Sequence, residues 1–116
     1  MRAVPVNLNL DKLIGQSLDQ ICIGAHDLQF RFTTSIIGCE GSVWVSDSLE
    51  KHLIFGRDGW EDTSSLMRLA GKKVRGWKKE SSHLLSIHLE NGFKIDLESE
   101  DSPWENFVLN TGEFVW

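Results

Sequence analysis

Strict alternation of apolar and polar residues is the strongest pattern in the chain. Leu28, Phe30 and Phe32 alternate with polar neighbours, and the same period recurs over 84–90 and 93–98. Successive side chains of a strand point to opposite faces, so this period predicts strands with one face in the core and one in solvent. We therefore expect a mostly antiparallel β fold.

The dipeptide Asn91-Gly92 joins the last two of these runs. Both central residues of a type I′ turn take positive φ, which Asn and Gly tolerate best. The pattern therefore predicts a hairpin over 84–98. The outer face of this hairpin is expected to carry five polar residues: His88, Glu90, Lys94, Asp96 and Glu98.

Less regular apolar runs predict further strands at 17–23, 42–46, 51–55, 73–79, 105–109 and 113–116. The segment 33–41 lacks such a pattern and is expected to be an inserted loop. The residues 62–65 have side chains that cap helices, and they precede Leu66, Leu69 and then Gly71. This order predicts one short helix, because the caps accept hydrogen bonds from its first turn and a glycine ends it.

Two pairs of stretches resemble each other at a nearly constant offset. The stretch 13–18 resembles 69–74 at an offset of 56, and 28–32 matches 85–89 at an offset of 57. Repetition of one supersecondary unit gives this kind of self-similarity. We therefore expect the chain to contain two pseudo-repeated units.

The chain has 116 residues, which is the size of one domain and leaves no room for two independent cores. We expect 1–116 to form a single domain of the α+β class, mostly antiparallel β. In it two β-meander units, approximately 9–60 and 61–116, pack together with one short helix between them. Either unit alone is too small to hold a core.

Charge is distributed unevenly along the chain. The net formal charge is −5; residues 90–116 hold seven acidic residues and one lysine, which gives −6 there and +1 for the rest. A basic group with no acidic residue in it lies upstream: Arg68, Lys72, Lys73, Arg75, Lys78 and Lys79. Each group is either a solvated face or a binding surface. An acidic surface attracts a basic partner, and the net negative charge disfavours nucleic acid.

The cysteines and the apolar runs bear on the compartment. Cys22 and Cys39 form neither a disulfide framework nor a metal-ligand spacing, which is typical of reduced, buried thiols. No run approaches the about 20 apolar residues of a membrane span, and the N-terminus lacks the apolar core of a signal peptide. We expect a cytoplasmic protein that holds no cofactor and no metal.

Motifs of the common catalytic classes are absent from the sequence, including the nucleophile elbow, the P-loop and the dinucleotide-binding glycine pattern. A thiol at Cys39, in the turn 38–41, would need a nearby base and a lowered pKa to act as a nucleophile. We therefore predict that the protein is not an enzyme.

Five tryptophans are many for this length, and Trp104 stands inside the acidic segment. Tryptophan occurs both in cores and at interface hot spots. Trp104 therefore either packs against the closing hairpin or anchors a partner. The residues expected to bind a partner are Asp96, Glu98, Glu100, Asp101, Trp104 and Glu105.

The second half carries a succession of motifs: Leu69-x-Gly71-x-x-Val74, Leu84-Leu85-Ser86-Ile87, Asn91-Gly92-Phe93-x-Ile95 and Trp104-Glu105-Asn106-Phe107-x-Leu109. This succession, specific over 66–109, resembles an uncharacterised bacterial domain-of-unknown-function family of small duplicated β-rich proteins. Proteins of this plan are similar to the immunity proteins encoded beside bacterial toxins, as in contact-dependent growth inhibition. The resemblance assigns no catalytic residue.

The resemblance implies a binding protein that neutralises a bacterial toxin by occluding it, and the clustered acidity favours a cationic nuclease as that toxin. Acidic side chains would imitate phosphates and speed the encounter, and Trp104 would add apolar contact area. The alternative is a small-ligand-binding or regulatory β-domain with a cavity between the halves, lined by Phe, Trp and Cys39. The oligomeric state is not encoded in these patterns.

Overall fold

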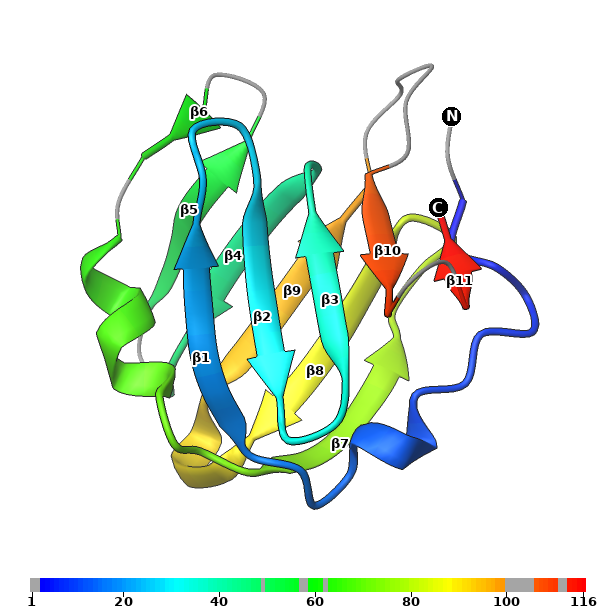
Figure 1. The fold of residues 1–116 in the computed structure, drawn as a ribbon, viewed down its shortest axis with the longest axis horizontal. Coiled ribbons are helices and arrows are strands. Elements are labelled where there is room, and N and C mark those ends of the chain that lie inside the picture. The colour runs from blue at the N-terminus through cyan, green and yellow to red at the C-terminus, as the bar shows by residue number, and fades with distance from the viewer. Residues whose placement is uncertain (1–2, 49, 57–58, 62, 100–105, 111–112) are drawn as a thin grey trace.

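The chain folds into two antiparallel β-sheets that form two layers (Figure 1). The computed structural model describes residues 3–48, 50–56, 59–61, 63–99, 106–110 and 113–116. All strand pairs in both sheets are antiparallel, as the alternation predicts.

One sheet has five strands: β1 (Leu18–Ile23), β2 (Leu28–Phe32), β3 (Ile36–Cys39), β10 (Phe107–Leu109) and β11 (Phe114–Val115). The other has six: β4 (Ser42–Ser46), β5 (Lys51–Gly56), β6 (Gly59–Trp60), β7 (Val74–Lys79), β8 (Leu84–Leu89) and β9 (Lys94–Glu98). Three 3-10 helices lie between strands or precede them: η1 (Asp11–Leu13), η2 (Ser64–Leu69) and η3 (Glu90–Gly92).

The strand order interlocks the two ends of the chain. The five-stranded sheet runs β1-β2-β3-β10-β11, and the six-stranded sheet runs β6-β5-β4-β9-β8-β7. The chain therefore changes sheets after β3, when β4 pairs with β9, and again after β9, when β10 pairs with β3. Each sheet is completed by strands from the other half of the sequence, so neither half forms its sheet alone.

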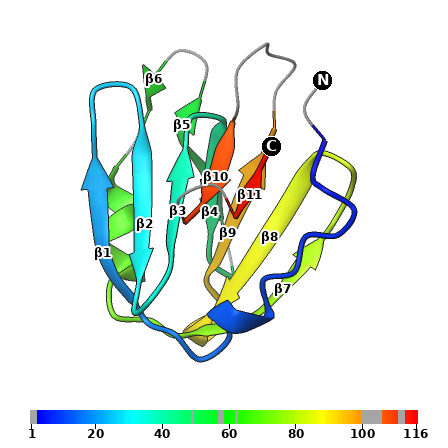
Figure 2. The same cartoon turned by 45° about the vertical axis from the view of Figure 1, so that its right-hand side comes forward.

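The core lies between the two sheets (Figure 2). Alternate residues of β2 face inward, and Phe30 is fully buried there. Ile87 of β8 and Ile95 and Leu97 of β9 are fully buried on the facing layer. These side chains belong to one contiguous cluster, and burial of a large aliphatic side chain contributes about 1.5–3 kcal/mol to folding.

The predicted hairpin over 84–98 is confirmed. Strands β8 and β9 pair with Ile87 opposite Ile95. Asn91 and Gly92 have φ of 62° and 78°, and the Phe93 N–H donates to the Glu90 carbonyl over 3.4 Å. These are the positive φ values that a type I′ turn requires at its two central residues.

The expectation of a loop at 33–41 is wrong, because this segment contains β3. The strand has only four residues and includes Gly38, so too few alternating positions exist for the pattern to be visible in the sequence. The strand lies at the centre of the five-stranded sheet between β2 and β10.

The predicted helix near 62–70 exists as η2, but it is a 3-10 helix. Ala70 has φ −59° and ψ 131°, and Gly71 has φ 82°, so a type II turn follows η2 and leads directly into β7. The described residues contain no α-helix, so the α+β label is not supported and the fold is mostly antiparallel β. None of the helices in the described part of the chain is long and apolar enough to cross a membrane.

Two matching turns join the two sheets at the edge strands β1 and β7. The Gly15 N–H donates to the Val74 carbonyl over 2.9 Å, and the Gly71 N–H donates to the Leu18 carbonyl over 2.8 Å. Both glycines have positive φ, 89° and 82°, as the second central residue of a type II turn requires. The starts of β1 and β7 are thereby held side by side.

Candidate functional site

A polar row crosses the central strands of the six-stranded sheet on its outward face. The strand register places Trp44 of β4 opposite Asp96 of β9, and Asp96 opposite Ser86 of β8. Side chains directly opposite one another on antiparallel strands share a face. The neighbours of Asp96 along β9, Ile95 and Leu97, are buried in the core, so this row points away from the core.

Asp96 is buried although it points away from the core, with only 2% of its surface exposed. The Ser86 hydroxyl donates to its Oδ1 over 2.6 Å. The Nζ atoms of Lys51 and Lys94 lie 3.4 Å and 3.7 Å from its Oδ2. A buried carboxylate is costly unless it is paired and hydrogen-bonded. Asp96 therefore holds the three groups around it in a fixed arrangement.

Trp44 lies half-buried beside this network. Its Nε1–H donates to Glu98 Oε1 over 3.3 Å, and the Nζ of Lys51 lies 4.8 Å from its ring centroid, within the range of a cation–π interaction. Lys51, Lys94 and Glu98 are each at least partly exposed. We call these residues the Trp44 patch: Trp44, Lys51, Lys94, Asp96 and Glu98.

The structure describes two of the six residues expected to bind a partner. The expectation that Asp96 belongs to an exposed acidic face is wrong, because it is buried and paired with lysines from β5 and β9. Glu98 is exposed and borders the Trp44 patch. The other four lie outside the described residues: Glu100, Asp101, Trp104 and Glu105.

Alternation along β9 correctly gives the face of Asp96, but it does not give the neighbours of Asp96 on that face. Lys51 reaches Asp96 from β5, which is separated from β9 by β4. The order of the strands was needed to bring this lysine to the site. The one signal in the sequence was the tryptophan of β4, which stands between Val43 and Val45 and therefore points outward when they point inward.

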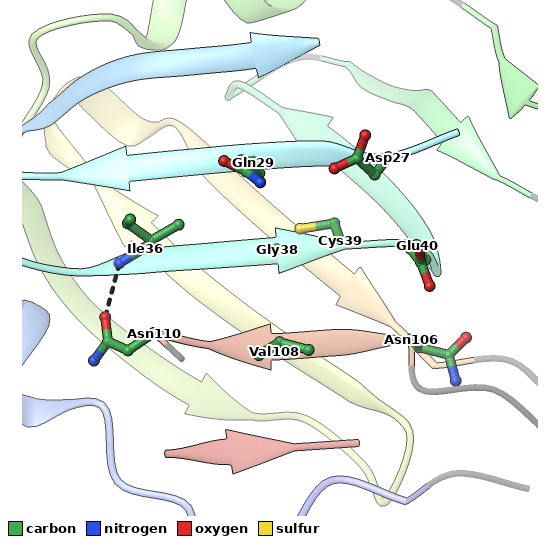
Figure 3. A pocket seen from close by; sticks show the side chains of 9 residues that line it. All are labelled: Asp27, Gln29, Ile36, Gly38, Cys39, Glu40, Asn106, Val108 and Asn110. Carbon is green, nitrogen blue, oxygen red and sulfur yellow. Dashed lines mark hydrogen bonds between the residues drawn. The ribbon is translucent and has the colours of Figure 1, made fainter. Parts of the chain in front are cut away.

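A second candidate site is a hollow of about 290 Å³ on the outward face of the five-stranded sheet (Figure 3). Gly38 of β3 lies opposite Gln29 of β2 on one side and opposite Val108 of β10 on the other. A side chain at position 38 would stand in this space, and an added Cβ would meet only the Val108 carbonyl oxygen, at 3.9 Å. We call this space the Gly38 hollow.

The two ends of the Gly38 hollow differ in polarity (Figure 3). Ile36 and Asn110 border one end, where the Asn110 Oδ1 accepts the Ile36 N–H over 2.9 Å. Asp27, Glu40 and Asn106 border the other end, where the Asn106 carbonyl accepts the Glu40 N–H over 2.6 Å. A hydrogen bond thus holds each end, and the two carboxylates lie at the same end.

Cys39 lacks the properties of a nucleophile. It is 1% exposed, and its Sγ lies 3.8 Å from the Ile37 carbonyl oxygen. Burial raises the pKa of the Cys39 thiol well above its ordinary value, and the negative charge of Asp27 raises it further. A catalytic thiol needs the opposite shift. Among the described residues, no group of three or more His, Cys, Asp and Glu side chains is placed to hold a metal ion.

A third candidate site is a hollow of about 600 Å³, which lies where the turn after β1 meets β5 and β6. Trp60 donates its Nε1–H to the Gly24 carbonyl over 2.8 Å, and its ring centroid lies 4.9 Å from that of Phe55. Phenylalanine, tryptophan and Cys39 were expected to line a cavity between the halves, and this hollow is lined by Phe55 and Trp60 but not by Cys39. Its lining residues are Ala25, His26, Glu40, Phe55, Gly56, Gly59 and Trp60.

Comparison of the chain with protein-family models, curated proteins and solved structures finds no match.

Proposed function

We propose that this protein is a non-catalytic binding protein that docks a protein partner on the Trp44 patch. The observation that carries the proposal is the fixed arrangement of Trp44 between Lys51 and Glu98, over the buried carboxylate of Asp96. Interface hot spots are enriched in tryptophan and are surrounded by groups that exclude water. A side chain already held in one conformation loses less entropy when a partner binds.

The charges of the Trp44 patch define the chemistry of the partner. Asp96 offsets one of the two positive charges of Lys51 and Lys94, so the patch offers a partner one net ammonium charge and the carboxylate of Glu98. A complementary surface has acidic groups opposite the lysines and a basic group opposite Glu98. Such complementarity sets specificity and association rate more than affinity.

The partner that we propose is a bacterial toxin domain, which the protein occludes in the cytoplasm. This proposal rests on the resemblance of the second half to small duplicated β-rich bacterial proteins and on the patch described above. The acid-rich segment 98–105 favours a basic domain such as a nuclease. Within the described part of this segment, Glu98 belongs to the Trp44 patch.

We also infer that the two halves arose from one duplicated unit. The bond from Leu18 N–H to the Lys72 carbonyl has a counterpart from Val74 N–H to the Gln16 carbonyl, each 2.8 Å long and offset by 56 residues. The register irregularity that follows Leu18 in β1 likewise has a counterpart that follows Val74 in β7. Exchange of strands between the two sheets accords with two units that stabilise each other around a pseudo-twofold axis.

Growth of bacteria that produce the toxin domain tests the proposal. The toxin used is the polypeptide encoded by the reading frame immediately upstream of this gene, and the full chain is produced with it. We expect the wild-type chain to restore growth, and Trp44→Ala to raise the dissociation constant by about thirtyfold, the effect of a hot-spot residue worth about 2 kcal/mol. Absence of rescue by the wild-type chain would refute the toxin proposal.

Two further variants separate binding from folding. Trp44→Phe keeps an aromatic ring on β4 and loses the N–H that Glu98 accepts, so we expect intermediate affinity. Met67→Ala removes another exposed apolar side chain, 83% exposed on η2, and is the matched control with unchanged affinity. If Met67→Ala weakens binding as much as Trp44→Ala, the Trp44 patch is not the interface.

The hollow beside Trp60 favours the alternative of a small-ligand-binding domain. It has two aromatic walls, Phe55 and Trp60, and a histidine, His26. Small-molecule sites combine aromatic or aliphatic walls with a few polar groups that orient the ligand. Quenching of tryptophan fluorescence by a panel of small aromatic ligands, lost in Trp60→Leu and kept in Trp44→Phe, would support this alternative over protein docking.

A further inference from the structure

We propose that the Gly38 hollow is a binding site for one organic cation, an alkylammonium or alkylguanidinium group. The site lies on the five-stranded sheet, whereas the Trp44 patch lies on the six-stranded sheet. It therefore goes beyond the proposed docking function and can be tested without a protein partner.

The shape of the hollow comes from one missing side chain. Ile36 and Gly38 of β3 and Glu40 directly after it face outward, because the intervening Ile37 and Cys39 are buried. Residues at this period are about 6.6 Å apart along a strand, so Ile36 and Glu40 are separated by about 13 Å. Gly38 leaves the middle of this row empty, which creates an elongated space with distinct ends (Figure 3).

The walls of this space suit an aliphatic stem with a cationic head. The side chains of Ile36 and Val108 line the hollow and offer apolar contact to methylene groups. The carboxylates of Asp27 and Glu40 border the far end. Long cationic side chains commonly bury an apolar stem while a charged end reaches polar groups.

The carboxylates at the acidic end are available to a ligand. Among the described residues, neither the Asp27 nor the Glu40 carboxylate accepts a hydrogen bond or forms an ion pair, and no lysine or arginine lines the hollow. Arg31 also lies on this face, where it donates to Gln29 Oε1 over 3.3 Å. Arg31 lies opposite Ile36 in the register, at the end away from the carboxylates.

The charge at this end selects cations over anions, and the apolar walls select an organic cation over a metal ion. A guanidinium group matches two carboxylates with several N–H donors, and charge-assisted hydrogen bonds of this kind are about twice as strong as neutral ones. Partial exposure of Glu40 and exchange with water keep the affinity for a small free ligand modest. We expect a saturable dissociation constant on the order of 1 mM.

Amide chemical shifts of the full chain, measured by NMR, test this site with three probes of one size. The probes are butylguanidinium, butylammonium and, as the anionic control, butyrate. Binding of the two cations should shift the amides of Gln29, Gly38 and Val108 in a saturable manner, and butyrate should leave them unchanged. Equal shifts with butyrate, or shifts that do not saturate, would overturn the proposal.

Two kinds of variant locate the cation. Gly38→Leu fills the hollow and is compatible with the fold, since an added Cβ has no neighbour closer than 3.9 Å; we expect it to abolish the shifts. The matched control is Gly76→Leu in β7, where an added Cβ has no neighbour within 4 Å; binding should be retained. The double variant Asp27→Asn, Glu40→Gln keeps the shape and should weaken binding at least about tenfold. Unchanged binding in Gly38→Leu or in the double variant would refute the site.

Discussion

Replacement of Asp96 by alanine is the sharpest test of the arrangement under the Trp44 patch. The substitution removes a carboxylate that is 2% exposed, the acceptor of the Ser86 hydroxyl, and the common partner of Lys51 and Lys94. The hydroxyl of Ser86, which is itself fully buried, then has no described acceptor. This loss differs from that of an exposed ion pair, because the buried Ser86 hydroxyl cannot form a replacement hydrogen bond with water.

The expected cost follows from these contacts. A hydrogen bond to a charged group contributes about 1.5–3 kcal/mol. The two lysines are 47% and 33% exposed, so each ion pair contributes only about 0–1 kcal/mol. We therefore expect Asp96→Ala to lower the free energy of unfolding by about 3 kcal/mol and Tm by about 10 °C. Asp96→Asn keeps an acceptor for Ser86 and should lose about 1–2 kcal/mol.

Urea unfolding followed by tryptophan fluorescence measures these differences. The denaturant dependence of the unfolding free energy should stay constant, so that a lower midpoint reports stability alone. A double-mutant cycle with Ser86→Ala isolates the hydroxyl–carboxylate interaction. If Asp96→Ala changes the free energy of unfolding by less than about 0.5 kcal/mol, as at an ordinary surface position, the reasoning on this buried carboxylate is wrong.

Three further predictions concern pH, packing and charge. The pKa of Cys39 is raised in the folded state, so its thiol stays protonated at pH values where the thiol of the unfolded chain ionises. Above the unfolded pKa, the free energy of unfolding measured by urea titration should therefore fall by up to about 1.4 kcal/mol per pH unit. Cys39→Ala should remove this pH dependence. Gly41→Ala should lower the free energy of unfolding by about 1–3 kcal/mol, since its Cβ would lie 2.8 Å from the Phe107 ring; wild-type stability would contradict the close approach. Replacement of three acidic residues by lysine, at Glu98, Glu100 and Asp101, should slow association with a basic toxin domain, mainly at low salt. Stopped-flow measurements give the association rate, and an unchanged rate would show that the acidic segment has no part in the encounter.

The hairpin over 84–98 illustrates what the sequence alone can predict. Its strands follow from the alternation around Ile87 and Ile95, and its turn follows from the dipeptide Asn91-Gly92. Both signals are local in the sequence, so they suffice to predict this hairpin. Strand β3 illustrates the opposite case. It is short and contains Gly38, and it is a strand because β2 and β10 pair with it from both sides.

The candidate sites depend still more on long-range order. The Gly38 hollow needs β10, which comes from the far end of the chain, and the Trp44 patch needs Lys51 to reach Asp96 across β4. Sequence reasoning placed Asp96 and Glu98 on one face correctly. It assigned Asp96 to an acidic surface because the period of a strand reveals the direction of a side chain and not the charges beside it.

The indole N–H resonances of the protein show directly whether a partner docks on the Trp44 patch. Trp44, Trp60 and Trp77 donate their indole N–H groups to Glu98, Gly24 and Asp11, so each resonance reports on a different place in the fold. When the toxin domain encoded upstream is titrated in, we expect the Trp44 indole resonance to shift or broaden while those of Trp60 and Trp77 do not change. A complex that forms with the Trp44 resonance unchanged would show that the partner does not dock on the Trp44 patch.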